Sequence, residues 1–401
     1  RARPDAQIGD IDGADLVVVV GGDPTNQHPI VELRIRKAAR NGVPVTVVGP
    51  RPHDLTTVGT HSLTPPGGLV NGVRAAEQAL RDTERAIVVW DEADLAQEPE
   101  AAAELAAAIG ATSGARQLEL AAEVNGAGLR ALGLPAEGVL EAIESGEVRS
   151  LLLVRADPVS GPAGARWEAA LGKIEILISV AAHADPVADR ATVTLPALTH
   201  REMEGVLVST ARRAQRLRPG SPGPEGAAAG WELLLALAHR LGDPPEGRTA
   251  AALFDAAARS RLGLNGLSHE ALGTLGAVVP RPSAPFPNGG TAAREPDGEG
   301  LPVVATTPIF GDATSHRSDA LAGVRTGAAA SLSGAQAAEL GLEGADRVRL
   351  TTPHGSCVVP LEVDDRLQDG AVFVTTGVPG SGIDRILPAD RGPVRAEVGA
   401  A

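Results

Sequence analysis

The chain has 401 residues, a net charge of −14 and one cysteine, Cys357. One thiol forms no internal disulfide and cannot supply the ligands of an iron–sulfur cluster or a structural zinc site. The acidic balance disfavours nucleic acid as a partner, and no apolar run approaches the roughly 18 residues of a membrane span, so we expect a cytoplasmic protein without direct membrane insertion.

The N-terminal segment predicts an α/β unit. Residues 14–20 ("ADLVVVV") form the continuous apolar run typical of a strand buried on both faces of a parallel sheet. Residues 21–29 read as a loop, residues 30–42 as a helix and residues 43–50 as the next strand. Within that helix we expect Ile30, Leu33 and Ile35 to point to one side.

The same pattern returns twice. Residues 85–95 lead into an alanine-rich helix over 99–111. Residues 148–158 lead into a helix over 165–174 and a strand over 175–181. Alternation of this kind predicts α/β layers around a mostly parallel sheet.

The pattern changes after a segment rich in proline, glycine and charge, residues 278–300, which reads as a linker. Short strands separated by turns follow it, with one small helix over 334–341, and together they predict a compact β-barrel. We therefore divide the chain into four segments: a Rossmann-like α/β domain (1–80), a second α/β domain (81–280), a linker (281–300) and a barrel (301–401).

Common catalytic motifs are missing from the sequence. There is no phosphate-binding Gly-x-x-x-x-Gly-Lys motif, no Gly-x-Ser-x-Gly nucleophile and no His-Glu-x-x-His metal motif. His53 and His61 have no third ligand at metal-binding spacing, and Cys357 lies in an alternating strand with no neighbouring His or Lys. We predict no catalytic residue and no metal site in this chain.

Two Asp-Pro pairs follow predicted strands, Asp23-Pro24 and Asp157-Pro158. Each alone is explained by a turn in which the aspartate closes the strand and the proline fixes the exit. Together they recur at equivalent points of two α/β units, at the strand ends where such sheets bind ligands. The repetition favours loops that descend from a ligand-binding site.

Three stretches resemble the molybdopterin (bis-guanine dinucleotide) oxidoreductase family. Residues 14–51 resemble its first dinucleotide-binding segment, residues 146–158 with 188–218 the second, and residues 337–374 its C-terminal barrel. The resemblance implies Rossmann-like parallel-sheet domains followed by a double-psi β-barrel.

The ending "TTGVPGSGIDRIL" (375–387) and the short middle segment resemble the large iron–sulfur subunit (the G subunit) of bacterial NADH-quinone oxidoreductase, respiratory complex I, more than formate dehydrogenase or nitrate reductase. This resemblance implies electron transfer from NADH to quinone and partners among the other peripheral-arm subunits. It also implies a location at the inner face of the plasma membrane and iron–sulfur clusters in an N-terminal portion. The chain starts at Arg1 and its one methionine is Met203, so we expect a processed chain or a fragment without that portion.

The resemblance also carries pterin-dinucleotide positions onto this sequence, namely Gly22, Asp23, Gly49, Arg51, Asp157 and His316. Two of them depart from the family pattern: Asp23 replaces an asparagine, and Gly49 replaces an acidic residue that accepts a hydrogen bond from the dinucleotide. A carboxylate about 6 Å from a phosphate repels it by roughly 3 kcal/mol at an effective dielectric near 20. We therefore expect that the site has lost its ligand, that this chain carries no cofactor, and that it is a structural, non-catalytic portion of the larger subunit.

Two alternatives stay open. In the first alternative, the chain is a fragment of a catalytic molybdenum or tungsten enzyme such as formate dehydrogenase, with molybdopterin guanine dinucleotide bound and the metal ligand in the missing portion. His316 is the best candidate residue for that alternative, although a plain barrel-loop histidine is the preferred interpretation. In the second alternative, the chain is an independent α/β module that binds an acidic or nucleotide ligand.

Overall fold

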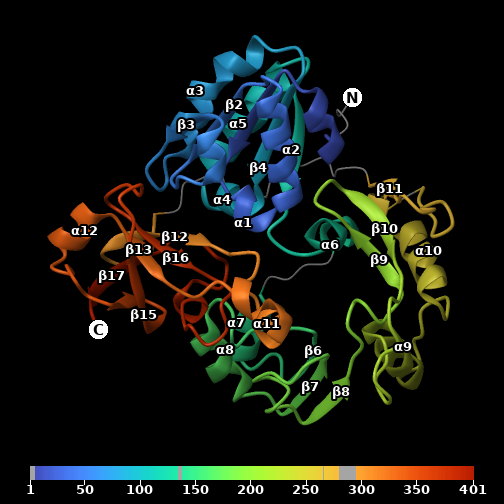
Figure 1. Cartoon of the computed structure of the whole chain (residues 1–401). Coiled ribbons are helices and arrows are strands. Elements are labelled where there is room, and N and C mark those ends of the chain that lie inside the picture. Colours follow the sequence, from blue (N-terminus) through green and yellow to red (C-terminus); the bar gives the residue numbers. More distant parts are fainter. Residues whose placement is uncertain (1–4, 134–137, 265, 280–294) are drawn as a thin grey trace. The chain divides into compact units, whose positions relative to one another are not determined.

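The computed structural model describes residues 5–133, 138–264, 266–279 and 295–401 (Figure 1). The chain divides into two compact units, which are described separately: Arg1–Ala122 with Ser160–Ala165 and Ala284–Ala401, and Glu123–Val159 with Arg166–Ser283. Most of the predicted linker, residues 281–294, lies outside the described residues. Among the described helices, none has the length and apolar character needed to cross a membrane.

The first unit contains a parallel sheet in the order β3-β2-β1-β4-β5. Its strands are β1 (Leu16–Val20), β2 (Val45–Gly49), β3 (Thr60–Leu63), β4 (Ala86–Asp91) and β5 (Arg116–Leu120). The apolar runs of β1 and β4 are buried along their whole length, as a strand covered by helices on both faces requires. The predicted strands over 14–20 and 43–50 are confirmed, and the run over 85–95 forms a strand only as far as Asp91, because Asp91 caps α4.

Helices cover both faces of this sheet, and a compact hydrophobic core lies between the sheet and the helices on one of its faces. They are η1 (Ile8–Gly13), α1 (Pro24–Gln27), α2 (Pro29–Arg40), η2 (Asp54–Thr57), α3 (Leu69–Arg81), α4 (Glu92–Gln97) and α5 (Pro99–Ala111). Val18 and Trp90 from the sheet pack in that core with Leu105 of α5. The predicted helix over 99–111 is confirmed residue for residue, because Pro99 suits the first helical position.

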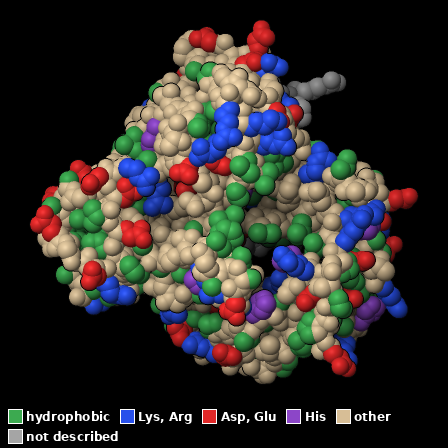
Figure 2. Space-filling view, viewed as in Figure 1, with side chains coloured by type: hydrophobic (Ala, Val, Ile, Leu, Met, Phe, Trp, Pro, Cys, Tyr) green, Lys and Arg blue, Asp and Glu red, His purple; other side chains and the backbone are tan. Residues whose placement is uncertain are grey.

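The packing face of α2 differs from the prediction. Ile30 and Leu33 are 61% and 59% exposed, whereas Val31 and Ile35 are buried. Buried positions 31, 35 and 38 follow the four-then-three spacing of one helix face, and residues 30 and 33 fall outside it. Lys and Arg side chains also gather over α2 on the face seen in Figure 2.

This orientation of α2 predicts unequal effects of two substitutions. Ile35→Val removes one buried methyl group and should lower the free energy of unfolding by about 1 kcal/mol. Leu33→Ala, on the exposed side of the same helix, should change it by less than about 0.5 kcal/mol. Urea denaturation of both variants measures the difference, and equal losses would contradict the assigned face.

The C-terminal part of the first unit is a closed barrel in the order β12-β16-β13-β15-β14-β17. Its elements are β12 (Leu301–Thr306), α11 (Ala313–Arg317), η4 (Asp319–Val324), β13 (Ala330–Leu332), α12 (Gly334–Glu339), β14 (Arg347–Thr352), β15 (Gly355–Val363), β16 (Val372–Thr375), η5 (Asp384–Ile386) and β17 (Arg395–Ala400). Buried Leu332, Leu350 and Val374 lie in its core. The predicted fold class, parallel-sheet α/β domains followed by a β-barrel, is confirmed.

The second unit contains a parallel sheet, β6-β7-β8, and an antiparallel sheet, β11-β10-β9. Its elements are α6 (Gly126–Leu132), α7 (Val139–Glu144), β6 (Ser150–Val154), α8 (Gly164–Leu171, whose first two residues are counted with the first unit), β7 (Ile176–Ala181), β8 (Val193–Pro196), β9 (Gly205–Val208), β10 (Arg213–Leu217), α9 (Gly230–Leu241), α10 (Ala250–Ser260), η3 (Leu262–Leu264) and β11 (Ala277–Val278). Buried Leu171 and Leu177 belong to a core between α8 and β7.

The four-segment division of the chain stays a proposal. Strands β4 and β5 lie beyond residue 80 but belong to the same sheet as β1, so the compact unit that starts the chain runs to Ala122. The barrel belongs to the same unit. Sheet pairing between strands far apart in sequence is the physical reason why the compact units differ from the sequence segments.

Candidate functional site

The order of the first sheet identifies where a ligand is expected. β1 lies between β2 and β4, so the chain connections run in opposite directions on its two sides. Open parallel sheets bind ligands at such a switch point, beyond the carboxyl ends of the strands. The loop that leaves β1 carries Gly21, Gly22 and Asp23 at that point. On the other side, Asp91 is the last residue of β4, and Asp94 lies in α4, which follows β4 directly.

The loop after β1 closely contacts the end of β4 and the start of α4. Gly21 and Gly22 both have left-handed φ angles, 66° and 68°. A Cβ on Gly21 would lie 2.8 Å from Oδ2 of Asp94, and a Cβ on Gly22 would lie 2.9 Å from Oδ2 of Asp91. The Gly22 amide donates a hydrogen bond of 2.7 Å to Oδ2 of Asp94. Glycine is required at both positions, because any side chain would collide with these carboxyl groups.

The side chain of Asp23 forms hydrogen bonds within its own segment of the chain. It is 5% exposed, and its Oδ1 accepts hydrogen bonds from the amides of Thr25 and Asn26, so it caps α1. Its Oδ2 accepts a 2.8 Å hydrogen bond from Nδ2 of Asn26. The turn that explains an isolated Asp-Pro pair is therefore present here, within a segment predicted only as a loop.

Three acids gather beside the glycines, and Asp91 is the most deeply buried of them. Burial and the neighbouring Asp94 raise the pKa of Asp91 to about 8, and burial raises the pKa of Asp94 as well. Burial also raises the pKa of Glu98 to about 7, although Oε2 of Glu98 accepts a hydrogen bond from the Leu69 amide. Low-dielectric surroundings favour the neutral form of a carboxyl group, so Asp91 retains its proton at neutral pH.

Arg51 provides the positive charge of the site. It follows β2, its guanidinium donates a hydrogen bond to Oγ1 of Thr306 in the barrel, and its Cζ lies 5.2 Å from the centre of the Phe373 ring. Burial lowers the pKa of Arg51, whereas the charges of Asp23 and Asp94 raise it. Arg51 therefore joins the sheet edge to the barrel and faces the acids of the switch point.

The barrel contacts the same edge through a glutamine. Nε2 of Gln368 donates to the carbonyl oxygens of Pro50 at 2.7 Å and Thr64 at 2.8 Å. Gly49, just before Pro50, is buried, and a Cβ placed on it would meet no atom within 4 Å. The position that carries an acidic residue in the family pattern therefore has room for a side chain.

Two histidines lie in the segment that follows β2. The carbonyl of Gly49 accepts a 3.3 Å hydrogen bond from Nε2 of His61. Burial lowers the pKa of His61 and of His53, so both rings are neutral near pH 7. Among the described residues, no group of three or more His, Cys, Asp or Glu side chains is arranged to hold a metal ion.

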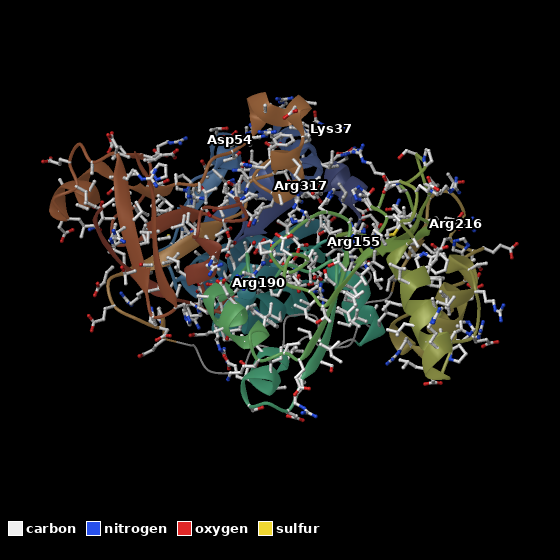
Figure 3. All side chains as sticks on the ribbon, turned by 90° about the horizontal axis from the view of Figure 1, so that it is seen from below. Lys37, Asp54, Arg155, Arg190, Arg216 and Arg317 are labelled. Atoms are coloured by element: carbon white, nitrogen blue, oxygen red, sulfur yellow. The ribbon has the colours of Figure 1, made fainter. Side chains whose placement is uncertain are left out.

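The other two predicted site residues lie elsewhere. Asp157 belongs to the second unit, in the loop after β6, two residues beyond Arg155, which has a left-handed φ of 54° (Figure 3). His316 lies on α11 of the first unit, next to Arg317 (Figure 3), and its Nε2 is 3.4 Å from the carbonyl of Thr326. The structure thus brings Gly22, Asp23 and Arg51 to one edge, with Gly49 beside them.

Sequence reasoning missed the acids that close this edge. Asp91 and Asp94 lie in "WDEAD", at the carboxyl end of the predicted run 85–95, so the rule that ligand-binding residues lie at the carboxyl ends of parallel strands was available to identify them. Thr306, Gln368 and Phe373 carry no such signal. They reach the site only because the barrel packs on the sheet edge.

Comparisons with known proteins find two matching families and solved structures of the same fold. The family described as "Molybdopterin oxidoreductase" matches residues 5–240, and the "Molydopterin dinucleotide binding domain" matches residues 311–398. In three dimensions the chain is similar to acetylene hydratase from Pelobacter acetylenicus, with a TM-score of 0.71 over 99% of this chain and 79% of that one. Their sequence identity is 12%, so this likeness concerns the fold.

Curated relatives share about a quarter of their residues with this chain. The chain is 26% identical to the NADPH-Fe(3+) oxidoreductase subunit alpha of Geobacter sulfurreducens, over 65% of this chain and 31% of that protein. It is 28% identical to the G subunit of the NADH-quinone oxidoreductase of Streptomyces coelicolor, over 61% and 28%. It is 26% identical to the F420-dependent formate dehydrogenase 2 subunit alpha of Methanococcus maripaludis, over 61% and 40%. The matched regions are therefore well under half of each relative.

These findings correct one prediction. The expectation that no cofactor belongs to this chain is wrong, because both matching families are defined by molybdopterin and its dinucleotide. The physical reason for the error lies in Asp23: its carboxylate caps α1 instead of standing free to repel a phosphate.

The residues at the sheet edge fit a dinucleotide. Arg51 offers a cation for a phosphate, and the two left-handed glycines permit close approach of backbone. The buried hydroxyl oxygens of Thr25, in α1, and Thr64, just after β3, have no hydrogen-bond partner in the described structure. Unpaired buried hydroxyls at a strand edge are what a polar ligand would satisfy.

Proposed function

Because the chain belongs to the molybdopterin oxidoreductase family, we propose that it is the cofactor-holding portion of a longer oxidoreductase subunit of the NADH-quinone type. The family and the likeness to the NADH-quinone oxidoreductase G subunit predicted from the sequence are confirmed. The observation that carries the proposal is the switch point of the first sheet, where Arg51 is held against the barrel beside Gly21 and Gly22.

Each residue has a defined task in this proposal. The guanidinium of Arg51 binds a phosphate of the dinucleotide, and the hydroxyls of Thr25 and Thr64 complete their hydrogen bonds on its polar groups. The Arg51–Phe373 contact and the two hydrogen bonds of Gln368 keep the barrel in place on that edge. The bound pterin supplies the redox chemistry of its metal, and the protein supplies binding, orientation and electrostatics.

In this proposal the chain binds and positions the cofactor and contributes no catalytic side chain of its own. Iron–sulfur clusters require several cysteines, and this sequence has one, so we place those electron carriers in parts of the subunit outside this chain. The likeness to the G subunit supports partners among the peripheral-arm subunits of a quinone-reducing complex, at the inner face of the plasma membrane.

Activity of the purified complex tests this assignment. The native complex that contains this chain should reduce quinone with NADH and should not oxidise formate. Formate oxidation together with near-stoichiometric molybdenum or tungsten would support the alternative, a catalytic portion of the formate dehydrogenase type, for which the relative in Methanococcus maripaludis is the argument.

The open space at Gly49 allows a gain-of-function prediction. Gly49→Asp places a carboxylate where the family pattern has an acidic acceptor, and no atom lies within 4 Å of the new Cβ. A carboxylate that accepts from a nucleobase amine forms a charge-assisted hydrogen bond, so the Kd for guanosine diphosphate should fall about tenfold. Calorimetric titration measures the change, and Gly49→Ala is the control that adds a side chain without the acceptor. Equal affinities of the two variants would contradict a nucleobase contact at this position.

A further inference from the structure

The contact between Asp94 and Gly22 closes the place where the proposed ligand would approach. The Gly22 amide lies at the end of β1, on the switch-point side of the sheet. Its donor is already used, because Oδ2 of Asp94 accepts it at 2.7 Å. The same oxygen stands 2.8 Å from the position of a Cβ on Gly21. A carboxylate of this chain therefore occupies the close approach that the two glycines make possible.

Asp94 is held in this position from its own side as well. Its amide donates a 2.9 Å hydrogen bond to Oδ1 of Asp91, the residue that caps α4. Burial raises the pKa of the Asp94 carboxyl, while the hydrogen bond from the Gly22 amide and the nearby charge of Arg51 oppose that shift. The carboxylate thus has one backbone donor and one nearby cation, the same two partners that a phosphate would take at this edge.

We propose that Asp94 is an internal competitor for the phosphate subsite, and that its displacement from the Gly22 amide sets how tightly a phosphate-bearing ligand binds. The proposal rests on the proposed function, since it takes the switch point as the dinucleotide site. Arg51 provides the attraction for the ligand, and Asp94 opposes it through like charge and through its hold on Gly22. Asp94 is therefore a specificity-determining residue that disfavours weakly held free phosphates.

The competition predicts a gain in affinity when the charge is removed. Asp94→Asn keeps the size of the side chain and a neutral acceptor for Gly22 but removes the negative charge. A hydrogen bond to a charged group contributes about 1.5–3 kcal/mol, which corresponds to roughly ten- to a hundredfold in Kd. We expect the Kd of the cofactor-free chain for guanosine diphosphate, measured by calorimetry, to fall by that factor.

Matched variants make the result specific. Asp82→Asn removes a carboxylate at the exposed end of α3 and should leave the Kd unchanged. Asp94→Ser removes the carboxylate with a shorter side chain and serves if Asp94→Asn fails to fold, which thermal unfolding of each variant reports. Both Asp94 variants should also bind inorganic pyrophosphate more tightly than the wild-type chain.

The possible outcomes separate the two proposals. If the wild-type chain and Asp94→Asn bind guanosine diphosphate with equal Kd, Asp94 is no competitor, and the dinucleotide site itself stands. If neither the wild-type chain nor any Asp94 variant binds guanosine diphosphate or pyrophosphate, the proposed dinucleotide site is overturned and the role of Asp94 with it.

Discussion

Asp91→Asn should stabilise the protein, and the gain should grow as the pH rises. Asp91 is 3% exposed, and its pKa is raised from 3.8 to about 8 by burial and by Asp94. The unfolded chain loses this proton near pH 4, whereas the folded chain keeps it until about pH 8. Between these values the folded state binds more protons, so the free energy of unfolding falls with rising pH.

The size of this effect follows from the difference between the pKa values of Asp91 in the folded and unfolded chain. Below pH 4, burial of the Asp91 carboxyl has no electrostatic cost, because the group is protonated in both states. Above pH 8 the cost is complete and lowers the free energy of unfolding by an amount on the order of a few kcal/mol. Asparagine is as good a cap for α4 as aspartate, so the substitution removes the charge without loss of the cap. Urea denaturation at pH 5.5 and pH 9 measures the free energy of unfolding of both proteins. A variant with the same pH dependence as the wild-type chain would refute the buried, protonated carboxyl.

Arg51→Ala should have the opposite effect and lower the stability by about 3 kcal/mol. The guanidinium contacts Thr306 and the Phe373 ring, and its charge acts on Asp23 and Asp94. Arg51 is half-buried, and its removal leaves the carboxylates of Asp23 and Asp94 without a nearby cation, which costs more than the loss of a single surface contact. The same variant should weaken binding of guanosine diphosphate by at least about tenfold, because it loses the phosphate-binding cation.

Two further variants show which property of Arg51 matters. Arg51→Lys keeps the charge but not the planar group over the Phe373 ring, so it should recover part of the stability and less of the binding. Arg74→Ala removes exposed ion pairs with Glu100 and Glu104 and should change the free energy of unfolding by less than about 1 kcal/mol. Equal losses for Arg51→Ala and Arg74→Ala would mean that Arg51 is no more than a surface charge.

Local sequence pattern was enough to predict most of the α/β framework. The run at 14–20 and the helix at 99–111 were predictable because buried parallel strands and helices with Pro at the first turn have strong local signals. The segment 21–29 was predicted as a loop and holds the four-residue helix α1, whose length is too short for a periodic pattern. Ile30 and Leu33 were assigned to the same side of α2 as Ile35, and both are exposed.

The candidate site was predictable only in part. Gly22, Asp23 and Arg51 follow β1 and β2 directly, so the strand-end rule and the family resemblance both select them. The contact of Gly22 with Asp94 joins residues 72 positions apart, and the contact of Arg51 with Thr306 joins residues 255 positions apart. Contacts of this kind depend on the register of the sheet and on how the barrel packs against it, and no local sequence pattern encodes either.

The most direct test of the proposed dinucleotide site is the nucleotide content of the longer subunit, purified with this chain in place. Acid hydrolysis releases guanosine monophosphate from a bound pterin guanine dinucleotide, and chromatography quantifies it. We predict near-stoichiometric guanosine monophosphate and oxidised pterin from the wild-type protein and at least about tenfold less from Arg51→Ala. A wild-type protein that contains intact iron–sulfur clusters but neither guanosine monophosphate nor pterin would contradict the dinucleotide site at the edge of the first sheet.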